Sequence, residues 1–298
     1  MSGPAFQRMA VAGVGLIGGS LALAARAVGL CAEVVGIGRR PERLARAVEL
    51  GVVDRWTTEP AEGAAGADLV VLAVPLGAMR ALMEALAPGL GPEAVVTDVG
   101  SAKAAVVTDA RLTLGAAFPR FVPGHPIAGT ERSGVEAAFA GLFRGHRVIL
   151  TPVAETEAGA LGRVRALWEA LGATVVEMDP SRHDRILAAT SHLPHLLAYA
   201  LVDLLAGLDE REEIFANAAG GFRDFTRIAS SDPVMWRDIC LANREALVAM
   251  LDRYGEALAA LRAAVEAGDG AALESLFARA KAARDACAAP GAGGEGQA

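Results

Sequence analysis

The run VAGVGLIGGS at residues 11–20 constrains the fold of this chain more than any other stretch. A short apolar segment at residues 8–13 leads into its glycines, and residues 16–28 then repeat apolar side chains with helical spacing. A second apolar run follows at residues 33–37. The pattern predicts a strand, a tight turn, a helix and a second, parallel strand.

Each glycine of this turn has a separate task in such a unit. Gly13 permits the sharp bend, Gly15 lets a pyrophosphate approach the backbone, and Gly18 lets the helix pack closely on the strand. The phosphates would lie at the helix N-terminus, beside Leu16 and Ile17. We therefore expect a Rossmann-type dinucleotide-binding domain; the alternative is a glycine turn that holds no ligand.

The end of the second strand bears on which dinucleotide would bind. An acidic residue at this place binds the ribose hydroxyls and repels a 2′-phosphate. The chain has Gly38-Arg39-Arg40 there, and two guanidinium groups suit NADP because arginine pairs bidentately with phosphate. The alternative is that Arg39 and Arg40 are solvated loop charges ahead of Pro41.

The alternation of strands and helices continues to residue 180. We expect strands at residues 52–56, 68–74, 94–98, 120–122, 148–151 and 174–178, and helices at 41–49 and 155–171. Val74 and Pro75 would close their strand near the cofactor. The pattern predicts an α/β dinucleotide-binding domain at residues 6–180, with its boundary at Pro180.

Two candidate catalytic side chains follow strands of this domain. Ser101 stands between the strand at 94–98 and the helix after it, where a hydroxyl serves either as a helix cap or at the ligand-binding edge of the sheet. His125 lies in the run PGHPIAG, whose prolines and glycines predict a rigid loop. Rigid loops at strand ends commonly carry catalytic groups.

From residue 181 the strand signals disappear and helical patterns take over. The first helix has an apolar stripe and is expected to kink at Pro194. His192 and His195 are three residues apart and share a face. Since no third ligand has a suitable spacing, we expect no metal site, and these histidines either face a substrate or form hydrogen bonds in the core.

The remainder of the chain predicts an all-α domain at residues 181–288. Residues 220–231 are expected to form a polar connector, and Asp232 and Pro233 to start a helix that runs to about residue 265. A last helix is expected at 271–286, followed by a disordered tail at 289–298. Because such long apolar helices need more covering than a small domain provides, we expect homodimerisation through this half.

Composition excludes several classes of partner. The chain has 298 residues, is 53% hydrophobic and carries a net charge of −7, which disfavours binding to nucleic acid or to anionic lipid. The apolar run at 186–208 contains both histidines and a charged residue, so we expect a buried helix rather than a membrane span. Three scattered cysteines without a CxxC, and no signal peptide, favour a reducing cytoplasm.

Several motifs, in order along nearly the whole chain, resemble those of the TyrA family of prephenate and arogenate dehydrogenases. They are GVGLIGGS at 13–20, DVGSAK at 98–103, GHPIAGTERSGVEAA at 124–138, SHLPH at 191–195 and GGFRDFTRIASSDPVMWRDI at 220–239. The resemblance implies an oxidative decarboxylation in tyrosine biosynthesis: hydride leaves C4 of prephenate for the nicotinamide, the ring carboxylate departs as CO2, and 4-hydroxyphenylpyruvate forms.

The resemblance also implies roles for individual residues. His125 would bind and polarise the C4 hydroxyl, Ser101 would support that hydroxyl or His125, and Arg227 would pair with a substrate carboxylate. A neutral imidazole is a suitable proton acceptor near pH 7, and a guanidinium binds carboxylate bidentately, so the chemistry agrees. The other residues implied at the substrate are His195, by the substrate side chain, with His192, Thr130 and Glu131.

Three questions stay open at this point. The family default is NAD, whereas Gly38-Arg39-Arg40 leans toward NADP. The substrate is prephenate or, giving tyrosine directly, arogenate. Rival interpretations are another two-domain dehydrogenase, such as a β-hydroxyacid dehydrogenase or a pyrroline carboxylate reductase, and a dinucleotide-sensing dimer without catalysis.

Overall fold

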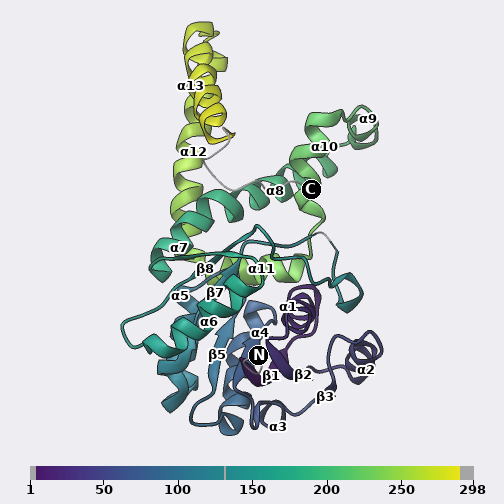
Figure 1. The fold of residues 1–298 in the computed structure, drawn as a ribbon. Helices are drawn as coiled ribbons and strands as arrows, with labels where there is room; N and C mark the ends of the chain where they lie inside the picture. The colour runs from purple at the N-terminus through teal and green to yellow at the C-terminus, as the bar shows by residue number, and fades with distance from the viewer. Residues whose placement is uncertain (1–4, 131, 289–298) are drawn as a thin grey trace.

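The computed structural model describes residues 5–130 and 132–288. A parallel sheet with helices on both faces forms the N-terminal part, and helices alone form the C-terminal part (Figure 1). The expected α/β domain followed by an all-α domain is therefore confirmed. The expected disordered tail at 289–298 lies outside the described residues.

The large sheet has six strands in the order β3-β2-β1-β4-β5-β6, and every neighbouring pair is parallel. The order reverses direction at β1, so β1 and β4 form the switch point at which ligands of such sheets bind. The strands are β1 Phe6–Ala12, β2 Cys31–Ile37, β3 Arg55–Thr57, β4 Leu69–Leu72, β5 Val95–Asp98 and β6 Phe121–Val122.

Helices cover both faces of this sheet and enclose two apolar cores. One core joins the sheet to α1 and α6 and includes Leu21 and Trp168, and the other joins it to α4 and α5 and includes Met79 and Val106. The helices are α1 Leu16–Ala27, α2 Pro41–Glu49, α3 Pro60–Ala64, α4 Leu76–Leu86, α5 Ala104–Thr113 and α6 Ala158–Ala170, with short 3₁₀ turns η1 Ala87–Gly89, η2 Gly115–Arg120 and η3 Val135–Ala137.

A separate three-stranded sheet follows the six-stranded one. Its order is β7-β8-β9, with β7 antiparallel to β8 and β8 parallel to β9. The strands are β7 Gly124–Pro126, β8 Arg147–Leu150 and β9 Thr174–Glu177. The expectation of a rigid loop around His125 is therefore wrong, because His125 pairs with Ile149 inside this sheet. Ladder hydrogen bonds rather than prolines fix its backbone.

The helical part departs from the sequence expectation at three places. Its first helix contains a π turn at Ala188–His192, and the helix continues through Pro194 in the first turn of α8. Residues 220–230 are helical rather than a polar connector, and the helix expected from Pro233 to about 265 is broken at Asn243. The elements are α7 Pro180–Leu187, η4 Ala188–His192, α8 Leu193–Ala206, α9 Arg211–Ala216, α10 Gly220–Thr226, η5 Arg227–Ser230, α11 Pro233–Ala242, α12 Arg244–Glu266 and α13 Gly270–Ala288.

The helical part is joined to the large sheet's domain through α11. The carboxylate of Asp238 accepts a hydrogen bond from the backbone N–H of Gly77 at 3.2 Å, at the N-terminus of α4. Helices α12 and α13 pair and project away from both sheets, as do α9 and α10 (Figure 1). Large apolar side chains stay uncovered on the helical part, among them Leu204 of α8, Leu241 of α11, Leu258 and Val265 of α12, and Phe277 of α13.

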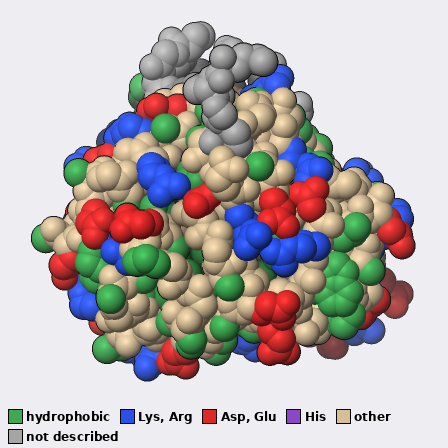
Figure 2. Space-filling model, turned by 60° about the horizontal axis from the view of Figure 1, so that its bottom comes forward, with side chains coloured by type: hydrophobic (Ala, Val, Ile, Leu, Met, Phe, Trp, Pro, Cys, Tyr) green, Lys and Arg blue, Asp and Glu red, His purple; other side chains and the backbone are tan. Residues whose placement is uncertain are grey.

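The face of the molecule that Figure 2 presents has no single dominant charge. Figure 2 shows acidic and basic side chains interspersed with apolar ones over the face it presents. Among the described residues, none of the helices has both the length and the hydropathy needed to cross a bilayer. An anionic ligand therefore has to be bound by local groups.

Candidate active site

The glycine turn after β1 has the geometry that a bound pyrophosphate requires. Gly13 has φ of +98°, and a Cβ placed on it would lie 2.2 Å from the carbonyl oxygen of Ala73. A Cβ on Gly18 would lie 2.2 Å from the carbonyl oxygen of Gly13. A Cβ on Gly15 would meet nothing within 4 Å. Two glycines therefore serve packing, and the third borders open space.

The N-terminus of α1 borders the same space. Leu16 and Ile17 form its first turn, which contains no acidic residue and receives no side-chain cap. The N–H groups and the positive end of the helix dipole are thus available to an anion. Val74 lies beside the turn, with its Cγ1 3.0 Å from the place of a Gly13 Cβ, and Pro75 follows it as the N-cap of α4.

Arg39 and Arg40 lie where β2 ends, and both are exposed. Neither side chain makes an ion pair or hydrogen bond with another described residue. Arg40 occupies the N-cap position of α2, and a Cβ on Gly38 would lie 3.2 Å from the side chain of Leu44. Both guanidinium groups are therefore available at the end of the strand.

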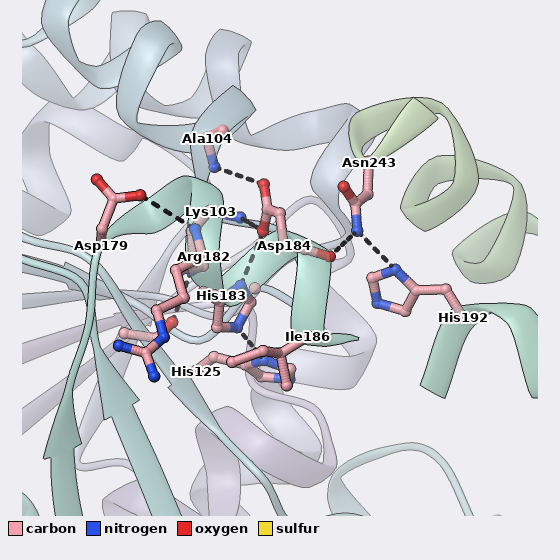
Figure 3. A network of polar contacts seen from close by, with 12 residues as sticks. Lys103, Ala104, His125, Asp179, Arg182, His183, Asp184, Ile186, His192 and Asn243 are labelled. Carbon is pink, nitrogen blue, oxygen red and sulfur yellow. Dashed lines mark hydrogen bonds and ion pairs between the residues drawn. The ribbon is translucent and has the colours of Figure 1, made fainter. Parts of the chain in front are cut away.

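His125 is the first member of a buried chain of hydrogen bonds (Figure 3). Its Nδ1 lies 2.9 Å from Nε2 of His183, and Nδ1 of His183 lies 2.8 Å from Oδ1 of Asp184. His183 and Asp184 come from α7, so the chain joins the small sheet to the helical part. The Nε2 atom of His125 makes no hydrogen bond to any described residue.

Asp184 connects this chain to the N-terminus of α5. Its Oδ1 accepts the backbone N–H of Lys103 at 2.8 Å, and its Oδ2 accepts that of Ala104 at 2.9 Å. The helix is thus capped by a carboxylate from another element, and Ser101 does not cap it. The backbone carbonyl of Asp184 accepts a hydrogen bond from Nδ2 of Asn243 at 2.8 Å.

A buried ion pair fixes the loop that carries Ser101 next to the strand that carries His125. Lys103 and Asp98 have no exposed side-chain surface and bond to each other. Lys103 Nζ also donates to the carbonyl of Gly124 at 2.6 Å. The Asp98 carboxylate accepts the N–H groups of Gly100 at 2.8 Å and Gly124 at 3.1 Å. Breaking such a buried pair from one side is strongly destabilising.

The pKa shifts of the chain follow from burial and from these contacts. Burial, with His183, Lys103 and His192 nearby, lowers the pKa of His125 well below 6.5. Burial also lowers the pKa of His183, although its bond to Asp184 acts in the opposite direction. For Asp184, burial raises the pKa, but hydrogen bonds from His183 and the α5 backbone outweigh it, so the net pKa is lowered. Two neutral imidazoles beside one carboxylate result.

His192 is buried within the protein. Its Nδ1 lies 3.0 Å from Nδ2 of Asn243, and its ring also bonds to the backbone of Ser101. Burial lowers its pKa to about 4. His192 therefore holds the Ser101 loop in place.

His195 and Arg227 lie near each other in the helical part. The ring of His195 stacks on Trp236 with centroids 3.6 Å apart, and its Nδ1 lies 2.9 Å from the carbonyl oxygen of Ser191. Burial and the charge of Arg227 lower the pKa of His195. Since a carbonyl only accepts, Nδ1 of His195 carries a proton and Nε2 is an acceptor.

Thr130 is exposed in the segment after β7, and its hydroxyl accepts the backbone N–H of Arg132 at 3.2 Å. Glu131 lies outside the described residues. Nowhere in residues 5–130 and 132–288 do three or more histidine, cysteine or carboxylate side chains form a group that could hold a metal ion.

Sequence reasoning missed His183, Asp184 and Asn243. The dipeptide His183-Asp184 stands four residues after Asp179, which caps α7 through the N–H of Arg182. The sequence signal for this dipeptide is that its two polar side chains share a helix face with Leu187 and Ala188, which are buried. Polar residues on a buried face require partners, so this face predicts a network, although not its members.

Family models match both parts of the chain. The nucleotide-binding domain of prephenate dehydrogenase matches residues 21–177, and the dimerization domain of prephenate dehydrogenase matches residues 179–279. Cyclohexadienyl dehydrogenase of Zymomonas mobilis is 40% identical over 287 residues, which cover 94% of this chain and 95% of that protein.

Solved structures agree with these matches. Prephenate dehydrogenase of Aquifex aeolicus, in complex with hydroxyphenyl propionate and NAD+, superposes with a TM-score of 0.87 at 39% identity, over 93% of this chain and 97% of that one. Arogenate dehydrogenase of Synechocystis gives a TM-score of 0.79 at 30% identity, over 94% and 99% of the two chains. The glycine turn, the buried histidine chain and these matches across both domains together show that the chain belongs to the prephenate dehydrogenase family.

Proposed function

We propose that the chain oxidises and decarboxylates prephenate to 4-hydroxyphenylpyruvate, a step of tyrosine biosynthesis. The observation that carries the proposal is the placement of His125, whose Nε2 is unpaired among the described residues while its Nδ1 is held by His183. Because the six strands are parallel, the glycine turn after β1 and the Ser101 loop after β5 share the carboxyl edge of the sheet. His125 follows β6 at the same edge.

We propose the following roles for the residues around this site. His125 accepts the proton of the C4 hydroxyl at Nε2, and Ser101 orients that hydroxyl. Arg227 binds a substrate carboxylate, and His195 lies by the substrate side chain. A bound nicotinamide dinucleotide supplies the hydride acceptor. Thr130, Glu131 and His192 complete the site in this proposal, with His192 acting through the backbone of Ser101.

The fit of a dinucleotide is supported by the glycine turn. The open space at Gly15 and the uncapped N-terminus of α1 suit a pyrophosphate. We further propose that Arg39 and Arg40 favour NADP over NAD, since both guanidinium groups are exposed at the end of β2. Replacing both with serine should weaken NADP binding and leave NAD binding almost unchanged. An unchanged ratio of the two affinities contradicts this preference.

The experiment that tests the activity is an assay of four combinations: prephenate or arogenate with NAD or NADP. Reduction of the dinucleotide that depends on prephenate, with release of CO2, supports the proposal. Reduction with arogenate alone favours the alternative substrate. Dinucleotide binding without turnover of either substrate favours a sensing protein and contradicts the proposal.

We also propose that the domain boundary falls at Pro180 and that two copies associate through the helical part. The first point is supported by the family models, which meet between residues 177 and 179. The second is supported by exposed Leu204, Leu241 and Phe277, which are 63%, 66% and 56% accessible in the single chain. Light scattering at micromolar concentration should give the mass of a dimer, and a monomer contradicts this.

A further inference from the structure

We propose that His183 and Asp184 form a proton store for His125. In this arrangement they keep the resting proton of His125 on Nδ1, and His183 receives that proton when Nε2 of His125 takes up another. The source of the second proton, the C4 hydroxyl, rests on the proposed function. The inference itself rests on the chain of contacts from Asp184 through His183 to His125.

The first step concerns where the protons lie at rest. Asp184 accepts two backbone N–H groups from α5 as well as its contact with His183. A carboxylate with these donors is ionised and can only accept, so Nδ1 of His183 carries a proton and donates it. Neutral His183 then presents Nε2 as an acceptor, and Nδ1 of His125 must be the donor in the contact at 2.9 Å.

The second step concerns the other ring nitrogen of His125, Nε2. A neutral imidazole has one N–H, so Nε2 of His125 is left with a lone pair. This is the nitrogen that makes no hydrogen bond to a described residue. The carboxylate of Asp184 thus sets the tautomer of His125 through His183, in the way that a carboxylate orients the imidazole of a hydrolase triad.

The third step is the balance of protons and electrons. The C4 hydroxyl proton moves to Nε2 of His125 while the Nδ1 proton moves to Nε2 of His183. The C4–H electron pair leaves as hydride to the oxidised dinucleotide, and a C4 carbonyl forms. The electron pair of the C–C bond between the ring and its carboxylate then enters the ring as CO2 leaves. The proton on His183 returns to Nδ1 of His125, and the proton on Nε2 of His125 returns to the C4 oxygen, which becomes the phenol. The sequence releases no net proton.

The location of the positive charge explains why a second histidine is useful. The charge of buried Lys103 disfavours an imidazolium at His125 and also at His183. At His183 the Asp184 carboxylate opposes this effect, because its Oδ1 lies 2.8 Å from Nδ1 of the ring. His183 has no exposed side-chain surface, so the proton cannot pass from it directly to water. The burial of His183 therefore suits a proton that has to return to His125 within the same turnover.

The first test reads the protons without substrate. Long-range ¹H–¹⁵N spectra of the labelled full-length protein at neutral pH should show His125 protonated at Nδ1 and bare at Nε2. On acidification, the first proton taken up by the pair should make His183 doubly protonated and move the His125 proton to Nε2. The charged or titratable groups that face the pair are Asp184, Lys103, Asp98 and His192. An imidazolium on His125 beside neutral His183 overturns the proposal.

The second test separates orientation from proton storage. In His183→Gln the amide oxygen can still accept from Nδ1 of His125 but cannot hold a proton, whereas His183→Phe removes both functions. We expect the glutamine variant to keep the His125 tautomer, with single-turnover hydride transfer slowed about a hundredfold, and the phenylalanine variant to lose both. The proton inventory of that step should change from two protons in the wild type to one in His183→Gln.

Controls keep the outcomes distinct. His146→Gln makes the same replacement outside the network and should match the wild type. A one-proton inventory in the wild type, or His183→Gln at the wild-type rate, overturns the proton store. If the wild type shows the expected tautomer but does not oxidise prephenate, the proposed function fails while the orientation of His125 by His183 stands. The spectra of the wild type decide that orientation even if a variant does not fold.

Discussion

The side-chain amide of Asn243 donates to Nδ1 of His192 at 3.0 Å and to the backbone carbonyl of Asp184 at 2.8 Å. Because an amide N–H can only donate, Nδ1 of His192 carries no proton, and the ring's single N–H is left for the backbone of Ser101. The folded protein therefore holds a neutral imidazole in the core, and adding a proton to it would break the contact with Asn243.

This relationship predicts an acid-sensitive fold. Burial lowers the pKa of His192 from 6.5 to about 4, so between these values the unfolded chain binds more protons than the folded one. Stability is therefore present above pH 6.5 and is lost as pH falls toward 4, by about 3 kcal/mol from this residue. Urea unfolding of the wild type and of His192→Gln, measured from pH 7 to pH 4, should show a smaller loss in the variant.

Other histidines act in the same direction, so the comparison between the two proteins is the informative quantity. Burial also lowers the pKa values of His125, His183 and His195. Their contribution is common to both proteins and cancels in the difference. Parallel stability curves over this pH range would contradict a neutral, buried His192.

The glycine turn predicts opposite effects for two similar replacements. Gly15→Ala places a methyl group in open space, so the melting temperature should not change while dinucleotide affinity falls. Gly18→Ala forces a methyl group against the Gly13 carbonyl and should destabilise the fold by roughly 1–3 kcal/mol. Thermal melts and dinucleotide titrations of both variants check this. Unchanged affinity in Gly15→Ala would mean that no ligand approaches that backbone.

Replacement of His125 by asparagine should act on the chemical step. Asparagine keeps a polar group on β7 but cannot take up a proton, so kcat should fall by roughly 10² to 10⁴ with little change in KM. Steady-state kinetics with prephenate measure this, with His146→Asn as the matched control. A large rise in KM at an unchanged kcat would assign His125 to binding instead.

Replacement of Arg227 by alanine should act on binding. Loss of the guanidinium leaves a substrate carboxylate without its partner, which costs a few kcal/mol, so KM should rise far more than kcat falls. Arg223→Ala, in the preceding helix α10, removes a nearby positive charge and should leave KM close to the wild-type value. If Arg227→Ala lowered kcat alone, the carboxylate would have to bind elsewhere.

The sequence predicts the large sheet well because its determinants are local. Buried parallel strands are continuous apolar runs, and the bend at Gly13 needs a glycine wherever it occurs. The same locality predicted the start of α11, where the Asp232 side chain caps the helix through the N–H of Met235. In these elements the residues that set the structure lie within the element itself, so the sequence was enough to predict them.

Features set by distant contacts were not predictable in the same way. The segment β7 is a strand because it pairs with β8, which lies more than twenty residues later in the chain. Nothing near residue 125 indicates this pairing, so His125 was expected in a loop. The break at Asn243 depends on contacts of its side chain with Asp184 and His192. The partners of His125 come from α7, and nothing near residue 125 indicates them.

The π turn at Ala188–His192 makes the active site depend on the exact count of residues in one helix. In an uninterrupted α-helix, the directions of His183 and His195 around the helix axis would differ by about 120°. The single extra residue of a π turn reduces this difference by about 100°, so the two side chains project from nearly the same face. A deletion of one residue at this place would leave a more regular helix and turn α8 away from α7. Deletions in this short segment should therefore be tolerated far less than deletions in helices α9 and α10.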